Sequence, residues 1–341
     1  MTTPKYIVSV DLDLPPLHSG LTPYCIFSQF VQTDNIIDEF IASIKRLNIL
    51  LKFAYSSEVM ILDSVSGRFQ PDLLACVFMR FFSKRPVVIM ADDMWHRGGK
   101  LKYLFQKMII QLADPSIDRY AVHSIGEGEI FADLWGISPK KVKVCIYNYT
   151  FTDEEVNGGE IVNKGYIFAG GNPSRDYDLL LETARQLPHR QFIVATRTLT
   201  NKKNIPENVK IVQVSHLEFI RLMRESDMVI TPLVAGKTKS SGQQTYLNAM
   251  RLGKISIVNG KNVLGVTDYI ENNLNGIITD GTVNGFCDAI EWVYLPSNEE
   301  KVNKIKKLAQ ETVLSFSYER YLKTMTLIVE EAVEEKKHDN R

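Results

Sequence analysis

A short polar stretch, SSGQQ at residues 240–244, runs directly into a helical pattern that ends at Gly253. The first turn of a helix has unpaired backbone N–H groups and a partial positive charge, so it can bind phosphate. A glycine in the stretch lets a ligand approach the backbone closely. The residues predicted to face a phosphate are Ser241, Gly242, Gln243 and Gln244. The simpler interpretation is a helix N-cap, formed by Ser241 or Thr245.

A second glycine-containing turn lies earlier in the chain, where residues 168–176 read FAGGNPSRD. Gly170 and Gly171 permit a tight turn, and Arg175 can bind phosphate oxygens through two parallel hydrogen bonds. We therefore expect these three residues to hold a diphosphate and to stabilise charge on a departing group. The alternatives are glycines that only shape the turn, and an arginine that pairs with Asp176 or Asp178.

Three further polar residues are expected near this diphosphate. Arg197 ends a strand-like segment, and Lys237 lies in the loop that leads to the SSGQQ stretch. Asn248 lies inside the following helix, and its amide can bond a ribose or sugar hydroxyl. The alternatives are solvated loop cations and an asparagine that bonds a neighbouring loop.

A pair of acidic residues, Asp92 and Asp93, ends the apolar segment RPVVIMAD and could be catalytic. A carboxylate there can act as a general base on a hydroxyl nucleophile. Adjacent residues of a strand point to opposite sides, so we expect only one of the two aspartates to face the substrate. His96 follows closely and could assist in binding an acceptor. The alternative is a strand-end carboxylate that caps a turn.

The segment DLD at residues 11–13 follows the first apolar strand, and Gly20 comes soon after it. We assign Asp13 and Gly20 to the binding of an acceptor substrate. The alternative is a pair of solvated loop carboxylates.

The same Asp-x-Asp pattern resembles haloacid-dehalogenase phosphatases, in which an aspartate nucleophile works with Mg²⁺. Ser64, Lys84 and the Asp92-Asp93 pair would take the other roles of that family. That resemblance accounts for nothing after residue 165, so it is the less favoured alternative.

Short apolar strands alternate with helical patterns along the chain, which predicts parallel sheets covered by helices. The strands predicted in the first half are 6–10, 58–63, 85–92, 119–124 and 143–148, with helices at 34–54, 71–83, 99–113 and 126–135. The strands predicted in the second half are 165–171, 191–197, 209–214, 227–233, 255–260 and 275–280. The helices predicted there are 174–187, 216–225, 242–252, 282–295, 299–313 and 318–337.

The polar segment TFTDEEVNGGEIVNK, residues 150–164, interrupts this alternation and predicts an interdomain linker. The predicted architecture is α/β, with two Rossmann-like domains that face a cleft. The predicted domains are residues 1–155 and 160–313, followed by a C-terminal helix and tail at 314–341, whose charged end we expect to fray. Ligands of such sheets bind beyond the carboxyl ends of the strands, where the candidate residues lie.

The composition is that of a globular protein and excludes several other classes. Lys plus Arg and Asp plus Glu both number 40, so the bulk charge does not indicate nucleic acid as a partner. The N-terminus does not resemble a signal peptide, and no apolar run reaches the ~18 residues that span a bilayer. The cysteines form no CxxC pair and are expected to be reduced core thiols of a cytoplasmic protein: Cys25, Cys76, Cys145 and Cys287.

The segment GKLKYLFQKMIIQL, residues 99–112, combines apolar residues at helical spacing with lysines. The favoured interpretation is a helix that packs on its own sheet. The alternative is a helix that lies on an anionic membrane, which would make the protein peripheral at the inner face of that membrane.

With these elements in place, the second half resembles the donor-binding domain of GT-B fold glycosyltransferases of the family 4 type. FAGGNPSRDYDLLLETARQLP resembles the glycine turn, basic residue and helix that open that domain. DMVITPL and then SSGQQTYLNAMRLGKISIVNGKNVLGVTDYIENNLNGIITDG resemble the donor signature and its continuation, so the resemblance covers about residues 165–295. VVIMADDMW and IDRYAVHSIGEGEIFADLWGISPKKVKVCIYN in the first half match more weakly.

The resemblance implies a hexosyltransferase-like enzyme that moves a sugar from a nucleotide-diphosphate sugar to a glycan or lipid-linked acceptor, in polysaccharide or glycoconjugate biosynthesis. It implies no metal and no other cofactor, because protein cations and helix dipoles offset the charge of the leaving group. The chain departs from the family near Ser240 and at Asn248, where the family has glutamates, and at Asp92, where it has histidine. The resemblance therefore selects Asp92, at the position of that histidine, as the aspartate that faces the substrate. A non-catalytic protein that binds nucleotide sugars is therefore an alternative.

Overall fold

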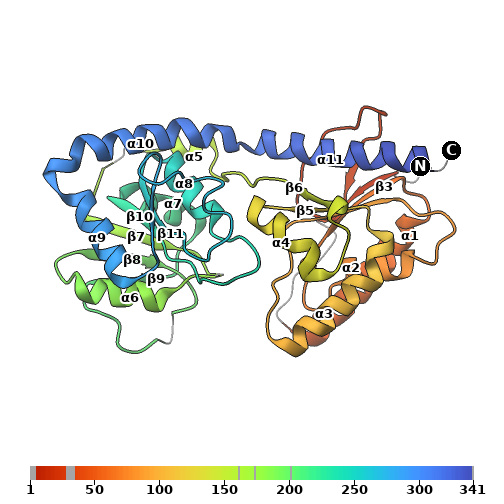
Figure 1. Cartoon of the computed structure of the whole chain (residues 1–341), viewed down its shortest axis with the longest axis horizontal. Coiled ribbons are helices and arrows are strands. Elements are labelled where there is room, and N and C mark those ends of the chain that lie inside the picture. Colours follow the sequence, from red (N-terminus) through yellow and green to blue (C-terminus); the bar gives the residue numbers. More distant parts are fainter. Residues whose placement is uncertain (1–4, 28–34, 160–161, 173, 200–201, 340–341) are drawn as a thin grey trace. The chain divides into compact units, whose positions relative to one another are not determined.

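The computed structural model describes residues 5–27, 35–159, 162–172, 174–199 and 202–339. The chain divides into two compact units (Figure 1). The first unit is Met1–Ile146 with Glu319–Arg341, and the second unit is Tyr147–Tyr318. Within the described ranges, each unit contains a parallel six-stranded sheet with helices beside it. The predicted α/β class with two Rossmann-like sheets is therefore confirmed.

The sheet of the first unit has the strand order β2-β1-β3-β4-β5-β6. Its strands are β1 (Tyr6–Val8), β2 (Pro23–Cys25), β3 (Val59–Asp63), β4 (Val87–Ala91), β5 (Arg119–Val122) and β6 (Val142–Val144). Its helices are α1 (Ile36–Ala54), α2 (Pro71–Met79), α3 (Lys100–Ala113), α4 (Ile125–Trp135) and α11 (Tyr318–Asp339). Alternate strand residues such as Met60, Leu62 and Val88 share one buried cluster with residues of α1 to α4, as the two-residue period of a strand requires.

The sheet of the second unit has the strand order β12-β11-β10-β7-β8-β9. Its strands are β7 (Tyr166–Gly170), β8 (Gln191–Ala195), β9 (Val209–Val212), β10 (Met228–Thr231), β11 (Ile255–Asn259) and β12 (Ile277–Thr279). Its helices are α5 (Asp153–Asn157), α6 (Tyr177–Gln186), α7 (His216–Glu225), α8 (Gln243–Arg251), α9 (Val283–Tyr294) and α10 (Glu299–Val313). Helices α6 and α9 pack on the face that presents Ile167 and Ile230, and helices α7 and α8 pack on the face that presents Phe168 and Val229.

Each sheet has a point where the chain leaves two neighbouring strands in opposite directions. In the second unit the chain passes from β7 to β8 on one side and from β10 to β11 on the other. In the first unit the corresponding neighbours are β1 and β3. Ligands of open parallel sheets bind at such switch points, beyond the carboxyl ends of the strands.

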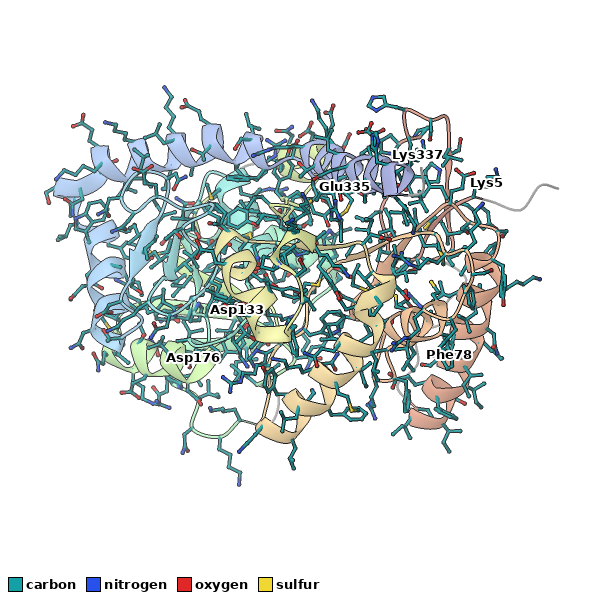
Figure 2. The ribbon with its side chains drawn as sticks, turned by 45° about the vertical axis from the view of Figure 1, so that its right-hand side comes forward. Lys5, Phe78, Asp133, Asp176, Glu335 and Lys337 are labelled. Atoms are coloured by element: carbon teal, nitrogen blue, oxygen red, sulfur yellow. The ribbon has the colours of Figure 1, made fainter. Side chains whose placement is uncertain are left out.

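The C-terminal helix α11 belongs to the first unit and continues to Asp339, and the expected fraying of its charged end stays a prediction. Polar contacts hold that end to the sheet. Glu335 pairs with Arg119 at 2.5 Å, and Lys336 Nζ donates to the Pro86 carbonyl at 2.6 Å. Figure 2 shows Glu335 on this helix.

Three smaller expectations have clear outcomes. All four cysteines are free thiols, but Cys25 is exposed, so the prediction of core thiols fails for it. The expected linker contains α5, whose first turn is fixed by reciprocal bonds between Thr152 and Glu155, while linker residues 160–161 lie outside the described ranges. Within the described ranges, no helix combines the length and the apolar composition needed to cross a bilayer.

Candidate functional site

The loops that follow β7 and β10 are joined to each other at the switch point of the second sheet. Arg175 forms an isolated antiparallel bridge with Leu233. The Asp176 N–H donates to the Pro232 carbonyl at 2.9 Å, and the Val234 N–H donates to the Ser174 carbonyl at 3.0 Å. These bonds hold the two loops together at the carboxyl edge of the sheet, where a ligand is expected.

The guanidinium of Arg175 lies between the end of β7 and the start of α8. Its Nε donates to the Gly170 carbonyl at 3.1 Å, and its Nη2 donates to the Thr245 hydroxyl at 2.8 Å. The side chain is half-buried, and burial lowers the pKa of the guanidinium while nearby Tyr177 and Tyr246 act in the opposite direction. Arginine remains charged in proteins, so this position offers a fixed, partly desolvated cation to an anionic ligand.

The alternative partners of Arg175 have other roles. The Asp176 carboxylate accepts from the Leu179 N–H at 3.0 Å and forms the N-cap of α6. Asp178 pairs with Lys202. Figure 2 shows Asp176 at this end of the helix.

The two predicted glycines are required for different reasons. A Cβ on Gly170 would lie 2.5 Å from the ring of Phe219, so this glycine permits α7 to pack on the sheet. Gly171 has φ of 107°, and a Cβ there would lie 2.8 Å from the Arg175 guanidinium. Gly171 therefore allows both the turn and the position of Arg175.

Helix α8 begins with a glycine N-cap. Gly242 has φ of 87°, and a Cβ there would lie 2.9 Å from Leu233. The interpretation in which Ser241 or Thr245 is the N-cap is wrong, because Gly242 holds that position and the Thr245 hydroxyl instead accepts from Arg175. The first turn of α8 therefore lies beside the guanidinium, and both features favour an anion.

The other predicted residues of this stretch lie around that turn. Ser241 is half-buried, Gln243 is buried, and Gln244 is exposed with its amide donating to the Tyr147 hydroxyl at 2.9 Å. Lys237 is half-buried in the loop between β10 and α8. The same loop is fixed to the following one, because the Gly236 N–H donates to the Asn262 carbonyl at 2.7 Å.

Asn248 is buried and anchors the segment that precedes α5. Its amide oxygen accepts from the N–H groups of Thr150 and Phe151 at 2.9 and 3.1 Å, and its amide nitrogen donates to the Thr150 hydroxyl at 2.8 Å. The structure thus favours the alternative in which this asparagine bonds a neighbouring loop. The contact to a ribose, which was the other interpretation, would compete with three existing bonds.

Arg197 lies one residue beyond the Thr196 that follows β8, and its side chain is exposed. The backbone there is held by Asn172, whose amide oxygen accepts from the Arg197 N–H at 2.8 Å and from the Thr196 hydroxyl at 3.0 Å. Sequence reasoning missed Asn172, although it follows the two glycines directly.

In the first unit, Asp92 and Asp93 both lie beyond the end of β4 and both are exposed. The argument that only one of them faces the substrate assumed a strand, but Asp92 has φ of 71°, a left-handed conformation that aspartate tolerates better than most residues. The backbone carbonyl of Asp93 accepts from the Ser64 hydroxyl at 2.8 Å, which ties this turn to the end of β3.

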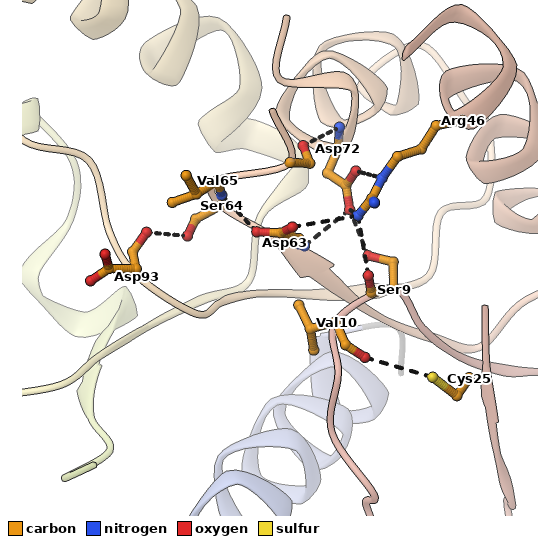
Figure 3. A network of polar contacts seen from close by, with 10 residues as sticks. Ser9, Val10, Cys25, Arg46, Asp63, Ser64, Val65, Asp72 and Asp93 are labelled. Atoms are coloured by element: carbon orange, nitrogen blue, oxygen red, sulfur yellow. Dashed lines mark hydrogen bonds and ion pairs between the residues drawn. The ribbon is translucent and has the colours of Figure 1, made fainter. Parts of the chain in front are cut away.

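A buried carboxyl, Asp63, lies at the end of β3 and was not selected from the sequence, although it ends the predicted strand EVMILD. Figure 3 shows the network around it. Asp72 accepts from Arg46 at 2.5 and 2.9 Å and from the Ser9 hydroxyl at 2.5 Å. Arg46 lies 3.7 Å from the second carboxylate, that of Asp63.

This network raises the pKa of Asp63 to about 7. Burial is the main cause, followed by the negative charge of Asp72, and Asp92 adds to the effect. The Val65 N–H, which donates to Asp63 at 2.7 Å, and the Arg46 charge act in the opposite direction. The carboxyl edge of this sheet therefore brings together an exposed carboxylate and a buried one that titrates near neutral pH.

The remaining predicted residues of the first unit occupy surface loops. Asp13 is exposed and His96 is half-buried. Gly20 has φ of 79°, and its N–H donates to the Leu17 carbonyl at 2.8 Å, so turn geometry alone requires a glycine. In the described parts of the chain, no three His, Cys, Asp or Glu side chains are arranged to hold a metal ion.

No protein-family model matches the chain, and no curated protein matches it in sequence. In structure it is similar to a glycosyltransferase from Rickettsia africae ESF-5, with a TM-score of 0.61 and 14% identity over 92% of this chain and 85% of that chain. Sucrose-phosphate synthase from Thermosynechococcus elongatus gives a TM-score of 0.67 and 13% identity, over 96% of this chain and 87% of that one. HepE from Anabaena, in complex with UDP-glucose, gives a TM-score of 0.65 and 15% identity, over 91% of this chain and 85% of that one.

These structural neighbours define the fold of the chain as GT-B. At such low identities the likeness concerns the fold alone. The narrower resemblance of the second half to family 4 remains a resemblance.

Proposed function

We propose that the chain is a glycosyltransferase that moves a sugar, of the hexose class, from a nucleotide-diphosphate sugar to a hydroxyl of a glycan or lipid-linked acceptor. The pathway would be polysaccharide or glycoconjugate biosynthesis in the cytoplasm, a location that suits four free thiols. The observation that carries the proposal is the Arg175 guanidinium, held by Gly170 and Thr245 beside the first turn of α8.

In this proposal the donor's diphosphate binds at the switch point of the second sheet. Arg175 and Lys237 supply positive charge, and Ser241, Gly242 and the first N–H groups of α8 supply donors. The same charges would stabilise the departing nucleoside diphosphate, so the reaction needs no metal ion. The GT-B fold supports this class of reaction, and HepE binds UDP-glucose, so uridine donors are the first to test.

The proposed step is a single displacement at the anomeric carbon of the donor sugar. The acceptor oxygen forms a bond to that carbon while the bond from the carbon to the diphosphate oxygen breaks. Asp92 takes the hydroxyl proton, and the nucleoside diphosphate leaves with the bonding electron pair, stabilised by Arg175. Such a displacement inverts the anomeric configuration, and Asp93 is the second candidate for the base.

A thermal-shift screen with UDP, GDP, CDP, ADP and dTDP and their sugars tests the donor site. A ligand that binds only the folded chain raises the Tm. We expect one nucleotide to stabilise the wild type, Arg175→Ala to abolish the shift and Arg175→Lys to retain part of it. Arg185→Ala is the matched control, because Arg185 is an exposed arginine of the same unit that pairs with Glu182. A shift that survives in Arg175→Ala would contradict the site.

The alternative is a protein that binds nucleotide sugars without catalysis. Its support is the departure from the family at Asn248, whose amide bonds the backbone of Thr150 and Phe151. To distinguish the enzyme from the non-catalytic protein, the chain is incubated with the sugar nucleotide that it binds, and mass spectrometry identifies the products. Release of the nucleoside diphosphate supports the enzyme, whereas tight binding with no turnover supports the alternative.

The phosphatase is not retained as a candidate. Lys84 precedes β4, whereas Asp92 follows it, so the two residues lie at opposite ends of this strand. A strand rises about 3.3 Å per residue, which separates the two ends by roughly 16 Å. A lysine at the far end is too distant to share a phosphate with Asp92.

A further inference from the structure

The outer face of α3 is apolar. Leu101, Leu104, Phe105 and Met108 follow one another at helical spacing, and Leu101 and Phe105 are 85% and 61% exposed. The side chains that α3 buries are Gln106, Ile110 and Ala113. Packing on its own sheet, the interpretation favoured from the sequence, therefore accounts for only the smaller part of the apolar residues in this helix.

The neighbouring helices extend this surface. Helix α2 packs between α1 and α3, and Figure 1 shows the three helices side by side. Phe78 of α2 and Phe81, which follows it, are 47% and 77% exposed, and Figure 2 shows Phe78 at the surface. On α1, Ile37, Ile41 and Ile44 are exposed at the same helical spacing. We call the outer surface of α1, α2 and α3 the three-helix face.

The three-helix face also carries positive charge. Helix α3 contains Lys100, Lys102 and Lys107 and no acidic residue. Among the described residues, the exposed charged side chains on and beside the other two helices are the cations Lys45, Lys52, Arg68, Arg80 and Lys84 and the carboxylates Asp38 and Glu58, of which Glu58 pairs with Lys5 and Arg68 contacts Glu39. The whole chain has a formal net charge of zero, so this excess is a local property of the face.

We propose that the three-helix face docks on an anionic lipid bilayer. Large exposed apolar surfaces on soluble proteins indicate interaction sites, and apolar side chains mixed with lysines fit a membrane surface whose headgroups are negative. A second copy of the chain fits less well, because self-association would bring two lysine-rich surfaces together. The inference stands on this surface alone and does not depend on sugar transfer.

Sedimentation of the full chain with lipid vesicles tests the proposal. We expect the chain to sediment with vesicles of phosphatidylcholine and phosphatidylglycerol, to remain in solution with phosphatidylcholine alone, and to be released as salt rises. Lys100→Gln with Lys102→Gln should lower the partition coefficient between vesicles and solution about tenfold or more, because each lysine near an anionic surface adds to the electrostatic attraction.

A second variant tests the apolar part. Leu101→Gln with Phe105→Gln and Met108→Gln should abolish sedimentation while leaving the circular dichroism spectrum unchanged. The matched controls are Leu217→Gln with Leu295→Gln and Lys301→Gln with Lys304→Gln, which change exposed residues of the second unit and should bind vesicles as the wild type does.

Two results would overturn the proposal. One is equal vesicle binding by the wild type and both three-helix-face variants. The other is a concentration-dependent dimer, seen by analytical ultracentrifugation, that the apolar variant abolishes, since a second copy would then be the occupant. The nucleotide-induced thermal shift should persist in all variants, so failure of membrane docking is distinguishable from failure of the donor site.

Discussion

The switch points of the two sheets have the same construction and opposite charge. In the second unit, the loops after β7 and β10 carry Arg175 and Lys237 beside the first turn of α8. In the first unit, the ends of β3 and β4 carry Asp63, Asp92 and Asp93. The edge of the second sheet, which we call the cationic edge, therefore suits a diphosphate. The edge of the first sheet, which we call the carboxylate edge, suits a group that must lose a proton.

The two edges also differ in how their charges are held. Arg175 bonds a carbonyl and a hydroxyl, which fix its position, and its burial lowers the pKa of the guanidinium. Asp63 lies against a buried arginine–aspartate pair, and its burial, followed by the negative charge of Asp72, raises its pKa. The two strand orders differ, so the comparison teaches that the switch point of a parallel sheet specifies where a site lies, while the side chains at the strand ends specify its chemistry.

The largest expected effect tests the carboxylate edge. Asp92→Asn removes the proposed base and should lower kcat about 10²–10⁴-fold, with the affinity for the nucleoside diphosphate unchanged. The check is the rate of product formation together with the nucleotide-induced thermal shift. Asp93→Asn is the matched variant and should retain most of the activity, and the reverse pattern would transfer the role of base to Asp93.

The second effect concerns the stability of the first unit. Asp72→Ala leaves the buried Arg46 without its bidentate partner and should lower the free energy of unfolding by about 3–5 kcal/mol. Denaturant unfolding measures it. Asp178→Ala breaks an exposed pair with Lys202 in the second unit and should cost less than about 1 kcal/mol. Equal losses would show that the Asp72 pair is not held as tightly as its burial indicates.

The third effect is a pH dependence that only the carboxylate edge should show. The pKa of Asp63 is raised to about 7 in the folded chain from 3.8. The folded state therefore keeps a proton that the unfolded state releases, and the contribution of Asp63 to stability falls as pH rises from about 4 to about 7. Denaturant unfolding of the wild type and Asp63→Asn should show the wild type losing a few kcal/mol relative to the variant over that range. Parallel curves would contradict the raised pKa.

The fourth effect tests the cationic edge. Arg175→Gln removes charge-assisted bonds to the diphosphate and should weaken nucleotide binding about 10–100-fold, as calorimetric titration would measure. Arg185→Gln should leave the affinity unchanged. A loss confined to the control would place the anion elsewhere on the second unit.

The smallest expected effect tests whether Asn248 of α8 contributes to stability or to nucleotide binding. Asn248→Ala leaves the N–H groups of Thr150 and Phe151 without their acceptor and should destabilise the chain by about 1–2 kcal/mol. Nucleotide affinity should stay the same. Asn48→Ala, on the exposed side of α1, is the control and should change stability little. A loss of affinity with normal stability would restore Asn248 to the donor site.

The fold could be predicted closely because its signals are local. Buried strands flanked by helical periods are visible in the sequence, and α7 and α10 have the bounds that the pattern predicts, 216–225 and 299–313. The edge strand β2 was missed because its three residues, Pro23–Cys25, are too short to show a period. Helix α11 was predicted at 318–337 and ends at Asp339, and its charged end bonds residues far away in sequence, such as Arg119.

The site could be predicted only in part, for the same reason. Gly171, Arg175 and Gly242 belong to turns that follow strands, so their location follows from the strand order. The role of Asn248 depends on Thr150, and the pKa of Asp63 depends on Asp72 and Arg46 of two helices. Contacts between elements distant in sequence decide these properties, and no local pattern reports them.

Hydrogen exchange with and without a nucleoside diphosphate tests the central claim most directly, because it reports on both sheet edges in one experiment. The account predicts slower exchange in peptides that cover the loops after β7 and β10 and the first turn of α8, and no such change after β1, β3 and β4. Slower exchange confined to the loops of the first unit would contradict the account, because the diphosphate would then bind at the carboxylate edge.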